Sequence, residues 1–122
     1  MIVIVTGGRS YAGTGLVEAL DALAQEHQRF SIFVGDATGA DRIAQAWARD
    51  RKPGLLCVFG AAWASYGKAA GPQRNARMVS RAIAEHLRGE RVICLAAPGG
   101  RGTADCVRRC REAGFEVRKV TT

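Results

Sequence analysis

The 122-residue chain lacks the features that mark membrane proteins, secreted proteins and disordered segments. No apolar run approaches the roughly 20 residues that a membrane helix requires. The opening MIVIVTGG is too short for a signal peptide and has no basic flank. Only three prolines and no low-complexity tract occur in a chain whose residues are 48% apolar. We therefore expect a single domain over residues 1–122, located in the cytoplasm and without membrane contact.

Metal-site and disulfide signatures are also missing. The four cysteines contain no CxxC pair, and Cys57 and Cys94 fall inside strand-like apolar runs. Cys106 and Cys110 share a helix face at i, i+4, but no histidine or third cysteine lies near them in the sequence. The pattern favours buried thiols over a zinc site, a redox pair or a disulfide framework. We expect no metal and no cofactor.

Acidic residues are fewer than basic ones, so the chain has a formal net charge of +7. A stripe of basic residues with interleaved aromatics would point to nucleic acid. Here the basic residues are dispersed, and aromatic residues make up only 7% of the chain. We expect most arginines and lysines to lie on a solvated surface, with the excess charge available to phosphate-bearing partners.

Five strand-like apolar runs alternate with four segments that have helical spacing. The runs cover residues 2–5, 30–34, 55–59, 92–97 and 115–120. The helical segments carry apolar residues, in chain order, at Leu16, Leu20 and Leu23; Ile43, Ala44, Trp47 and Ala48; Met78, Val79, Ala82, Ile83 and Leu87; and Val107, Cys110 and Ala113. Strands that are apolar throughout predict a parallel sheet covered by helices on both faces.

The alternation predicts an α/β fold: a three-layer, Rossmann-like, doubly wound parallel sheet of five strands in the order 3-2-1-4-5. In such a sheet, ligands bind beyond the carboxyl ends of the strands, where the strand order reverses. The candidate site therefore lies in the four loops after the first four strands. They are TGGRSY (6–11), GDATGAD (35–41), GAAWASYGKAAGPQRN (60–75) and PGGRGTAD (98–105).

The loop at residues 98–105 is the strongest candidate for a phosphate site. Its glycines let the main chain approach a ligand closely, and Gly102 and Thr103 open a helix whose free N–H groups favour an anion. The alternative, a tight turn capped by Thr103, needs one glycine rather than three. We predict that phosphate or ribose binds at Pro98, Gly99, Gly100, Gly102 and Thr103.

The loop after the first strand would flank the same crevice. Gly7 and Gly8 form a second glycine turn there. Arg9 and Tyr11 follow it and could pair with or stack on a ligand, although the dinucleotide pattern GxGxxG is absent. A surface arginine is the alternative interpretation of Arg9.

The loop after the second strand contains Gly35, Asp36 and Thr38 and leads into a helix that starts at Thr38 or Gly39. Asp41 falls in the first turn of that helix. It is either a helix cap, stabilised by the helix dipole, or an acceptor for a ribose hydroxyl.

The loop after the third strand is long and is therefore suspected of function. Pro72 suits the first position of a helix, which would place Gln73, Arg74 and Asn75 on the first turn, facing the crevice. Arg74 could make a bidentate contact with a phosphate or carboxylate. Lys68 is either a phosphate ligand or a solvated loop lysine.

In this order and spacing, TGGRSY, GDATGADRIAQAWA, GKAAGPQRNARMV and PGGRGTADCVRRCREAGFEV resemble the YspA-related branch of the SLOG superfamily, small Rossmann-like proteins often carried by bacteria and phages. The resemblance spans nearly the whole chain. It implies a nucleotide-derived ligand, because SLOG relatives include LOG-type phosphoribohydrolases, which cleave cytokinin nucleotides, and domains that sense NAD-derived or ADP-ribose-like signals. The family, together with the mixed apolar and basic third and fourth helical segments, suggests a homodimer.

LOG enzymes share an arginine in RK..M and a glutamate that ends PGGxGTxxE. Arg74 and Met78 match the first pattern, with Asn75 in place of the lysine, whereas Cys106 occupies the glutamate position and Asp105 lies one residue earlier. A carboxylate stabilises the oxocarbenium-like state of N-glycosidic cleavage, and a thiol holds no equivalent charge unless its pKa is lowered. One helix residue is about 100° of rotation, so Asp105 would need a shifted backbone to replace the glutamate.

Three functions follow from these observations. The first is a nucleotide-binding domain that senses or sequesters an NAD- or ADP-ribose-like molecule or a nucleoside monophosphate. The second is a nucleoside-phosphate N-glycosidase in which Arg74 positions the substrate and Asp105 or Asp41 supplies the carboxylate. The third is a DNA- or RNA-binding accessory protein, suggested by the net charge and by a distant resemblance to the DNA-processing SLOG protein DprA. The dispersed basic residues disfavour this third function.

Overall fold

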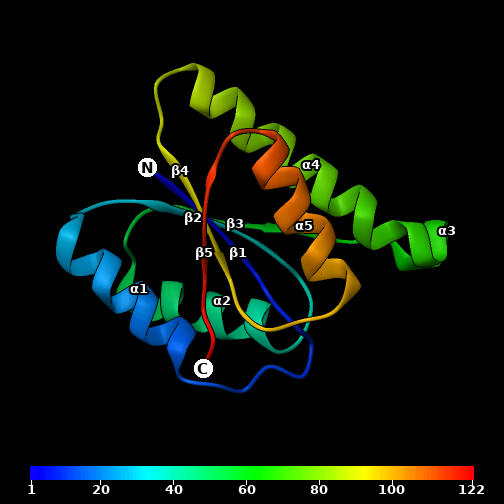
Figure 1. Ribbon diagram of the computed structural model, residues 1–122, viewed down its shortest axis with the longest axis horizontal. Helices are drawn as coiled ribbons and strands as arrows, with labels where there is room; N and C mark the ends of the chain where they lie inside the picture. The colour runs from blue at the N-terminus through cyan, green and yellow to red at the C-terminus, as the bar shows by residue number, and fades with distance from the viewer.

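The middle layer of the protein is a five-stranded, all-parallel sheet, in a computed structural model that describes residues 1–122 (Figure 1). The strands are β1 (Ile2–Thr6), β2 (Ser31–Gly35), β3 (Leu56–Phe59), β4 (Val92–Ala96) and β5 (Glu116–Lys119). Their order is β3-β2-β1-β4-β5, which confirms the predicted order. The central strands β1 and β4 are buried along their whole length, because helices cover both faces of the sheet.

Helices α1 (Gly15–Glu26) and α2 (Ala40–Arg51) cover one face, and α4 (Ala70–Leu87) and α5 (Arg101–Glu112) cover the other (Figure 1). Each face has its own apolar core. Leu16, Leu20 and Trp47 pack with the β1 residues Val3 and Val5 on the first face. Met78, Val79, Ala82, Cys106 and Cys110 pack with Ile2 and Ile4 on the second. The predicted three-layer fold is therefore present.

The segment between β3 and α4 differs from the prediction of four helices. A short helix, α3 (Trp63–Tyr66), and a 3-10 turn, η1 (Gly67–Ala69), lead directly into α4. Pro72 is therefore the third residue of α4 rather than its first, and Arg74 begins the second turn. Proline is still tolerated, because the N–H groups of a first turn have no acceptor within the helix.

The apolar stripe predicted for the third helical segment extends too far. Met78, Val79 and Ala82 are buried, but Ile83 is partly exposed and Leu87 is 81% exposed. The 18 residues of α4 span about 27 Å, whereas a five-residue strand spans about 17 Å. The end of α4 therefore extends past the sheet that it covers. The strand limits also differ from the prediction by one residue at several ends.

The topology brings the carboxyl ends of β1, β2 and β4 together. Thr6 at the end of β1 pairs with Ala96 at the end of β4, and Val5 pairs with Val34 of β2. The chain leaves β1 toward one face and β4 toward the other, so the strand order reverses between them. A crevice therefore opens at this edge. None of the helices combines the length and the apolar character needed to cross a bilayer.

Candidate functional site

A cavity of about 590 Å³ opens at the carboxyl ends of β1, β2 and β4. This size falls within the range of about 300–1,000 Å³ that is typical of small-molecule sites. Twelve predicted site residues line it: Gly7, Gly8, Arg9, Gly35, Asp41, Lys68, Arg74, Asn75, Gly100, Gly102, Thr103 and Asp105. All four predicted loops therefore contribute to one site.

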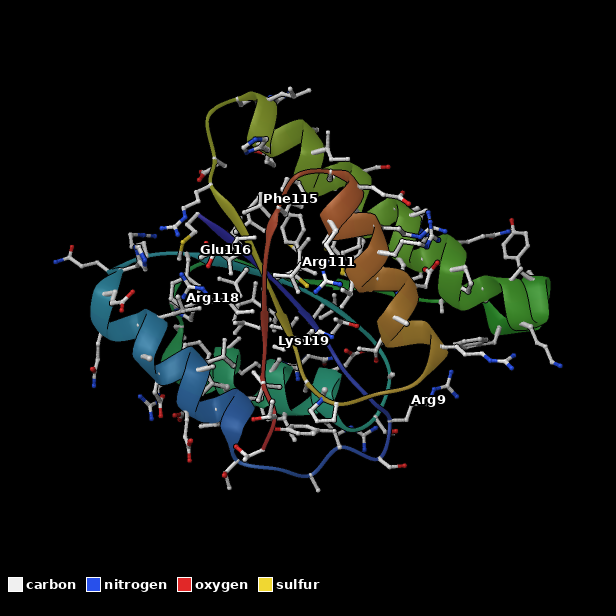
Figure 2. The ribbon with its side chains drawn as sticks, in the orientation of Figure 1. Arg9, Arg111, Phe115, Glu116, Arg118 and Lys119 are labelled. Carbon is white, nitrogen blue, oxygen red and sulfur yellow. The ribbon has the colours of Figure 1, made fainter.

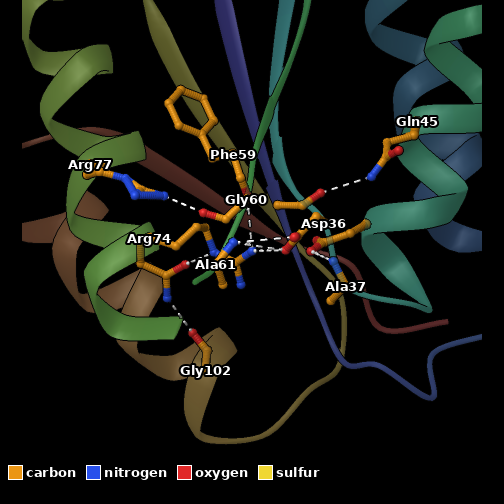
Figure 3. Close-up of polar contacts among 12 residues, drawn as sticks. Asp36, Ala37, Gln45, Phe59, Gly60, Ala61, Arg74, Arg77 and Gly102 are labelled. Carbon is orange, nitrogen blue, oxygen red and sulfur yellow. Dashed lines mark hydrogen bonds and ion pairs between the residues drawn. The ribbon is translucent and has the colours of Figure 1, made fainter. Parts of the chain in front are cut away.

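Arg74 lines the cavity and is only 9% exposed. Figure 3 shows its guanidinium directed toward Asp36. Its Nη1 donates to Oδ1 of Asp36 at 3.1 Å and to the carbonyl of Phe59 at 3.3 Å, and its Nε donates to Asn75. Nη2 has no protein partner among these bonds. Because no buried side-chain nitrogen lacks a hydrogen-bond partner, Nη2 must be accessible, and the accessible space beside Arg74 is the cavity.

Asn75 connects Arg74 to helix α5. Its Oδ1 accepts the bond from Nε of Arg74 at 3.0 Å. Its Nδ2 donates to the carbonyl of Gly102 at 3.1 Å (Figure 3). The same Nδ2 donates to Oδ2 of Asp105, also at 3.1 Å. The side chain thus fixes the guanidinium of Arg74 relative to the first turn of α5.

Asp105 also lines the cavity, but its carboxylate is held by the protein. Arg109 donates to Oδ2 at 3.0 Å and Arg108 to Oδ1 at 2.8 Å. Burial disfavours ionisation, but the hydrogen bonds from Arg109, Asn75 and Arg108 outweigh it and keep the pKa of Asp105 below its ordinary value. Asp105 is therefore a paired anion with little capacity to exchange a proton near neutral pH.

Asp41 is the less engaged carboxyl group of the cavity. It is 5% exposed, and its Oδ2 accepts the N–H of Ala37 at 3.1 Å, whereas Oδ1 has no protein partner. Burial raises the pKa of Asp41 from 3.8 to about 6, although the Ala37 N–H and nearby Arg74 act in the opposite direction. The bond to Ala37 closes the loop before α2 and does not cap a helix N–H group. It therefore counts against the helix-cap interpretation of Asp41.

The glycine turns at residues 7–8 and 98–100 pack against each other. The N–H of Gly8 donates to the carbonyl of Pro98 at 2.8 Å. A Cβ at Gly99 would collide with Oγ1 of Thr103 and lie 2.7 Å from the nitrogen of Gly8, so this glycine permits the close approach of the two loops. A Cβ at Gly100 or Gly102 would meet nothing within 4 Å. These two glycines thus present bare backbone to open space.

Helix α5 begins at the cavity, and the N–H groups of its first turn are free. Gly100 is the N-cap residue, and no side chain caps the turn, so the alternative of a turn capped by Thr103 is not what the structure has. The earliest intrahelical bond of this turn runs from the N–H of Ala104 to the carbonyl of Gly100 at 3.0 Å. The amides of Arg101, Gly102 and Thr103 therefore have no acceptor within the helix, which is the arrangement that attracts an anion.

Three cations around the cavity have no acidic partner: Arg9, Lys68 and Arg101. Each is exposed, and none takes part in an ion pair of the protein. Arg101 sits in the first turn of α5, where a positive charge opposes the helix dipole. The sequence analysis did not predict Arg101, because the glycines on both sides of it indicated contacts of the backbone and not of a charged side chain.

Trp63 is another lining residue that the sequence analysis did not predict. It begins α3, and the guanidinium carbon of Arg9 lies 4.8 Å from the centre of its ring. The length of the loop at residues 60–75 was the available signal, but it did not show which side chain would reach the site.

Six predicted residues lie outside the lining of this cavity: Tyr11, Asp36, Thr38, Gly39, Pro98 and Gly99. They hold the loops in place. The Tyr11 hydroxyl accepts the N–H of Leu16, Thr38 donates to the carbonyl of Arg9, and Asp36 receives Arg74 and the N–H of Ala61 (Figure 3). Gly39 has φ +70°, where a Cβ would also collide with the carbonyl of Gly8.

A second hollow of about 650 Å³ lies on the other side of the first turn of α5. Pro98 and Gly99 line it, together with Arg111 of α5 and Lys119 of β5. Figure 2 shows Arg111 and Lys119 on these two elements, with Arg9 beyond the N-terminal end of α5. Gly100 and Thr103 line both hollows, so one turn of helix separates them.

Three cysteines form a cluster beneath α5. Cys106 and Cys110 of α5 meet Cys94 of β4, and all three side chains are fully buried. The mutual contact of the three thiols raises the pKa of Cys94 and leaves that of Cys106 the lowest of the three. Cys94 is thus a third cysteine that lies next to Cys106 and Cys110 in the fold, although it is distant from them in the sequence. The three cysteines are not arranged to hold a metal ion.

Comparison with known proteins places the chain in a family. Residues 1–66, more than half of the chain, match the family described as "YAcAr: YspA, cpYpsA-related SLOG family". The matched part contains β1, β2 and β3 with the first three site loops as far as α3. No curated protein matches the sequence. The family match agrees with the strand order and with the loops that line the cavity, and the chain belongs to the YspA and cpYpsA-related SLOG family.

Proposed function

We propose that the protein binds a nucleotide or nucleotide-derived molecule, such as AMP, ADP-ribose or NAD, with a phosphate group at the first turn of α5. The observation that carries the proposal is the guanidinium of Arg74, a largely buried side chain whose Nη2 has no protein partner and is accessible from the cavity. A guanidinium contact of this kind suits a phosphate oxygen. Membership of the SLOG family supports a nucleotide-related ligand.

The surrounding groups favour the same ligand. The free amides of Arg101, Gly102 and Thr103 face the cavity, and Gly100 and Gly102 leave room for an anion to approach the backbone. Arg9, Lys68 and Arg101 add positive charge that no carboxylate of the protein neutralises. A phosphate would satisfy both sets of donors.

The sugar would lie next to Asp41. A Cβ at Gly35 would collide with Nη1 of Arg74 and lie 2.6 Å from Oδ2 of Asp41, so the two side chains meet above this glycine. Oδ1 of Asp41 is free to accept a hydrogen bond from a ribose hydroxyl. Asp41 and Arg74 would thus hold the sugar and the phosphate side by side.

Isothermal titration calorimetry with AMP, ADP-ribose, NAD and cyclic AMP tests the proposal. Arg101→Ala removes a charged phosphate donor worth about 1.5–3 kcal/mol and should weaken binding at least tenfold. Arg111→Ala is the matched control, because it removes the same charge from the same helix outside the cavity. A folded protein that binds none of the four ligands would refute the proposal, and equal effects of both variants would refute the assigned phosphate position.

Hydrolysis of the N-glycosidic bond of a nucleoside monophosphate is the second candidate function. One observation favours it: Asp41 combines a pKa near 6 with an oxygen that is open to the cavity. Such a group can donate a proton to the departing base while water adds to the ribose carbon, giving free base and ribose 5-phosphate. Asp105, the other candidate carboxylate, has a lowered pKa and three protein partners.

Chromatography of the products distinguishes binding from hydrolysis. If the protein is a hydrolase, AMP should yield adenine, and Asp41→Asn should abolish the release while AMP still binds. Asp105→Asn should retain turnover, because this residue does not supply the proton. Binding without release of adenine by the unchanged protein would leave the binding function alone.

A further inference from the structure

Helix α3 carries a large aromatic side chain that the apolar core does not use. None of the four residues of α3 is buried. Trp63 is 42% exposed and lines the cavity, whereas Tyr66, on the same helix, is 56% exposed and does not. Trp47, the other tryptophan, stacks on Phe30 in the core at a centroid distance of 6.0 Å. The protein therefore places one of its two indoles at the cavity.

The indole of Trp63 rests against helix α4 at a glycine. A Cβ at Gly71 would lie 3.2 Å from Cη2 of the ring, so the absence of a side chain there lets the ring pack closely on the first turn of α4. Both Gly71 and Trp63 line the cavity. The ring edge is thus supported by the backbone of α4, and the side chain of Trp63 stays 42% exposed.

Arg9 covers a face of this indole. Its guanidinium carbon lies 4.8 Å from the ring centre, at the distance of a cation–π contact. Arg9 has no ion-pair partner, and its side chain is exposed. A long, unpaired side chain can shift without breaking other contacts, so another planar group can replace or join it on the ring.

We infer that Trp63 is the platform on which the nucleobase of the ligand stacks, with Arg9 as its cationic neighbour. The inference rests on the proposed nucleotide-binding function. With the phosphate at α5 and Arg74, and the ribose at Asp41, Trp63 supplies the aromatic surface of the same cavity. A base stacks on an aromatic ring through its π face, and every base has such a face. The platform therefore selects a nucleobase as a class and discriminates weakly between bases.

Paired titrations with AMP and ribose 5-phosphate test the inference, because the two differ by the base. Loss of a stacked base lowers affinity about tenfold. Trp63→Leu should weaken AMP binding by about this factor and leave ribose 5-phosphate binding unchanged. Trp63→Phe should retain most of the AMP affinity, because it keeps an aromatic face. Tyr66→Leu is the matched control on the same helix and should change neither ligand.

Tryptophan fluorescence provides an independent readout of contact with the base. AMP should quench the emission of the unchanged protein more than ribose 5-phosphate does. Trp63→Leu should abolish the difference, because Trp47 lies in the core away from the cavity.

The outcomes separate this inference from the proposed function. If neither AMP nor ribose 5-phosphate binds the unchanged protein, the proposed function fails and the platform fails with it. If both bind and Trp63→Leu leaves AMP affinity unchanged, or weakens both ligands equally, only the platform is overturned. Binding of ribose 5-phosphate without AMP would also overturn the platform, since the base would then be excluded.

Discussion

Nε of Arg74 donates a hydrogen bond to Oδ1 of Asn75 at 3.0 Å, so two adjacent residues of α4 are coupled through their side chains. The amide of Asn75 also binds the carbonyl of Gly102 and the carboxylate of Asp105. Asn75 therefore aligns the arginine with the turn that we assign to phosphate. Its role is to position Arg74, and this role leads to a first prediction.

Asn75→Ala should lower the free energy of unfolding by about 1–3 kcal/mol, because it leaves the buried Nε of Arg74 without its acceptor. It should also weaken AMP binding, because the guanidinium is no longer held toward α5. Urea unfolding and calorimetry measure the two effects. Gln73→Ala, at an exposed position two residues away that makes no side-chain hydrogen bond, is the control and should change neither quantity. Unchanged stability of Asn75→Ala would contradict the role of Asn75.

The stability of the protein should depend on the ionisation of Asp41. Its pKa is raised from 3.8 to about 6 in the folded protein, so the folded state binds the proton more tightly than the unfolded state. The stabilisation from the protonated carboxyl is complete below pH 4 and is lost as the pH rises to about 6. The loss is about 3 kcal/mol, since one pKa unit corresponds to 1.36 kcal/mol.

Asp41→Asn should remove this pH dependence, because an amide keeps an acceptor for the Ala37 N–H but does not ionise. The variant should match the unchanged protein at pH 4 and be more stable than it at pH 7. Urea unfolding at both pH values measures the difference. Asp50→Asn, at an exposed carboxylate, should show no such change. A constant difference between Asp41→Asn and the unchanged protein across this pH range would contradict the raised pKa.

Two glycines of the loop at residues 98–105 should respond to alanine in opposite ways. Gly99→Ala should destabilise the fold by about 1–3 kcal/mol, because its Cβ collides with Thr103 and approaches Gly8. Gly102→Ala meets no neighbour within 4 Å and should stabilise α5 by up to about 1 kcal/mol. The same methyl group should weaken AMP binding if the phosphate contacts this turn. Thermal unfolding and calorimetry check both effects. A stable Gly99→Ala would show that the two loops are not tightly packed.

Thiol labelling should separate Cys57 from the other cysteines. Cys57 is partly buried, whereas Cys94, Cys106 and Cys110 have no exposed surface. A thiol reacts only when it is ionised and the reagent can reach its sulfur. A chromogenic disulfide reagent should therefore label one cysteine in the folded protein and four in denaturant. Cys57→Ser should abolish the single fast reaction. A second fast thiol in the folded protein would show that the cluster under α5 is accessible.

The sequence was sufficient to predict the sheet and the positions of its loops. Apolar runs such as residues 2–5 and 92–97 have no polar alternation, which identifies strands covered on both faces, and this fixes the layers. The place of Arg74 at the crevice was also predicted, because Pro72 indicated a helix that starts close to the loop after the third strand; the structure places Arg74 in the cavity lining. The match to the family over residues 1–66 agrees with the predicted resemblance.

Contacts between distant segments were not predictable in the same way. Asp105 is only 30 residues from Asn75, yet no local pattern shows that the two side chains bind each other. Cys94 and Cys106 likewise meet only because β4 lies under α5. Trp63 was missed because α3 is too short to have a periodic pattern, and its place at the cavity depends on how η1 turns the chain into α4.

The shared turn at Gly100 and Thr103 has a practical consequence for genetic work on this protein. Because the two hollows have this wall in common, a defective variant at either position does not reveal which hollow the cell requires. Assigning a phenotype calls for substitutions on residues that belong to one side alone, such as Lys68 for the cavity and Arg111 for its neighbour. Variants at Gly100 or Thr103, variants of residues that line only the cavity, and variants of residues that line only the second hollow should therefore give three different phenotypes.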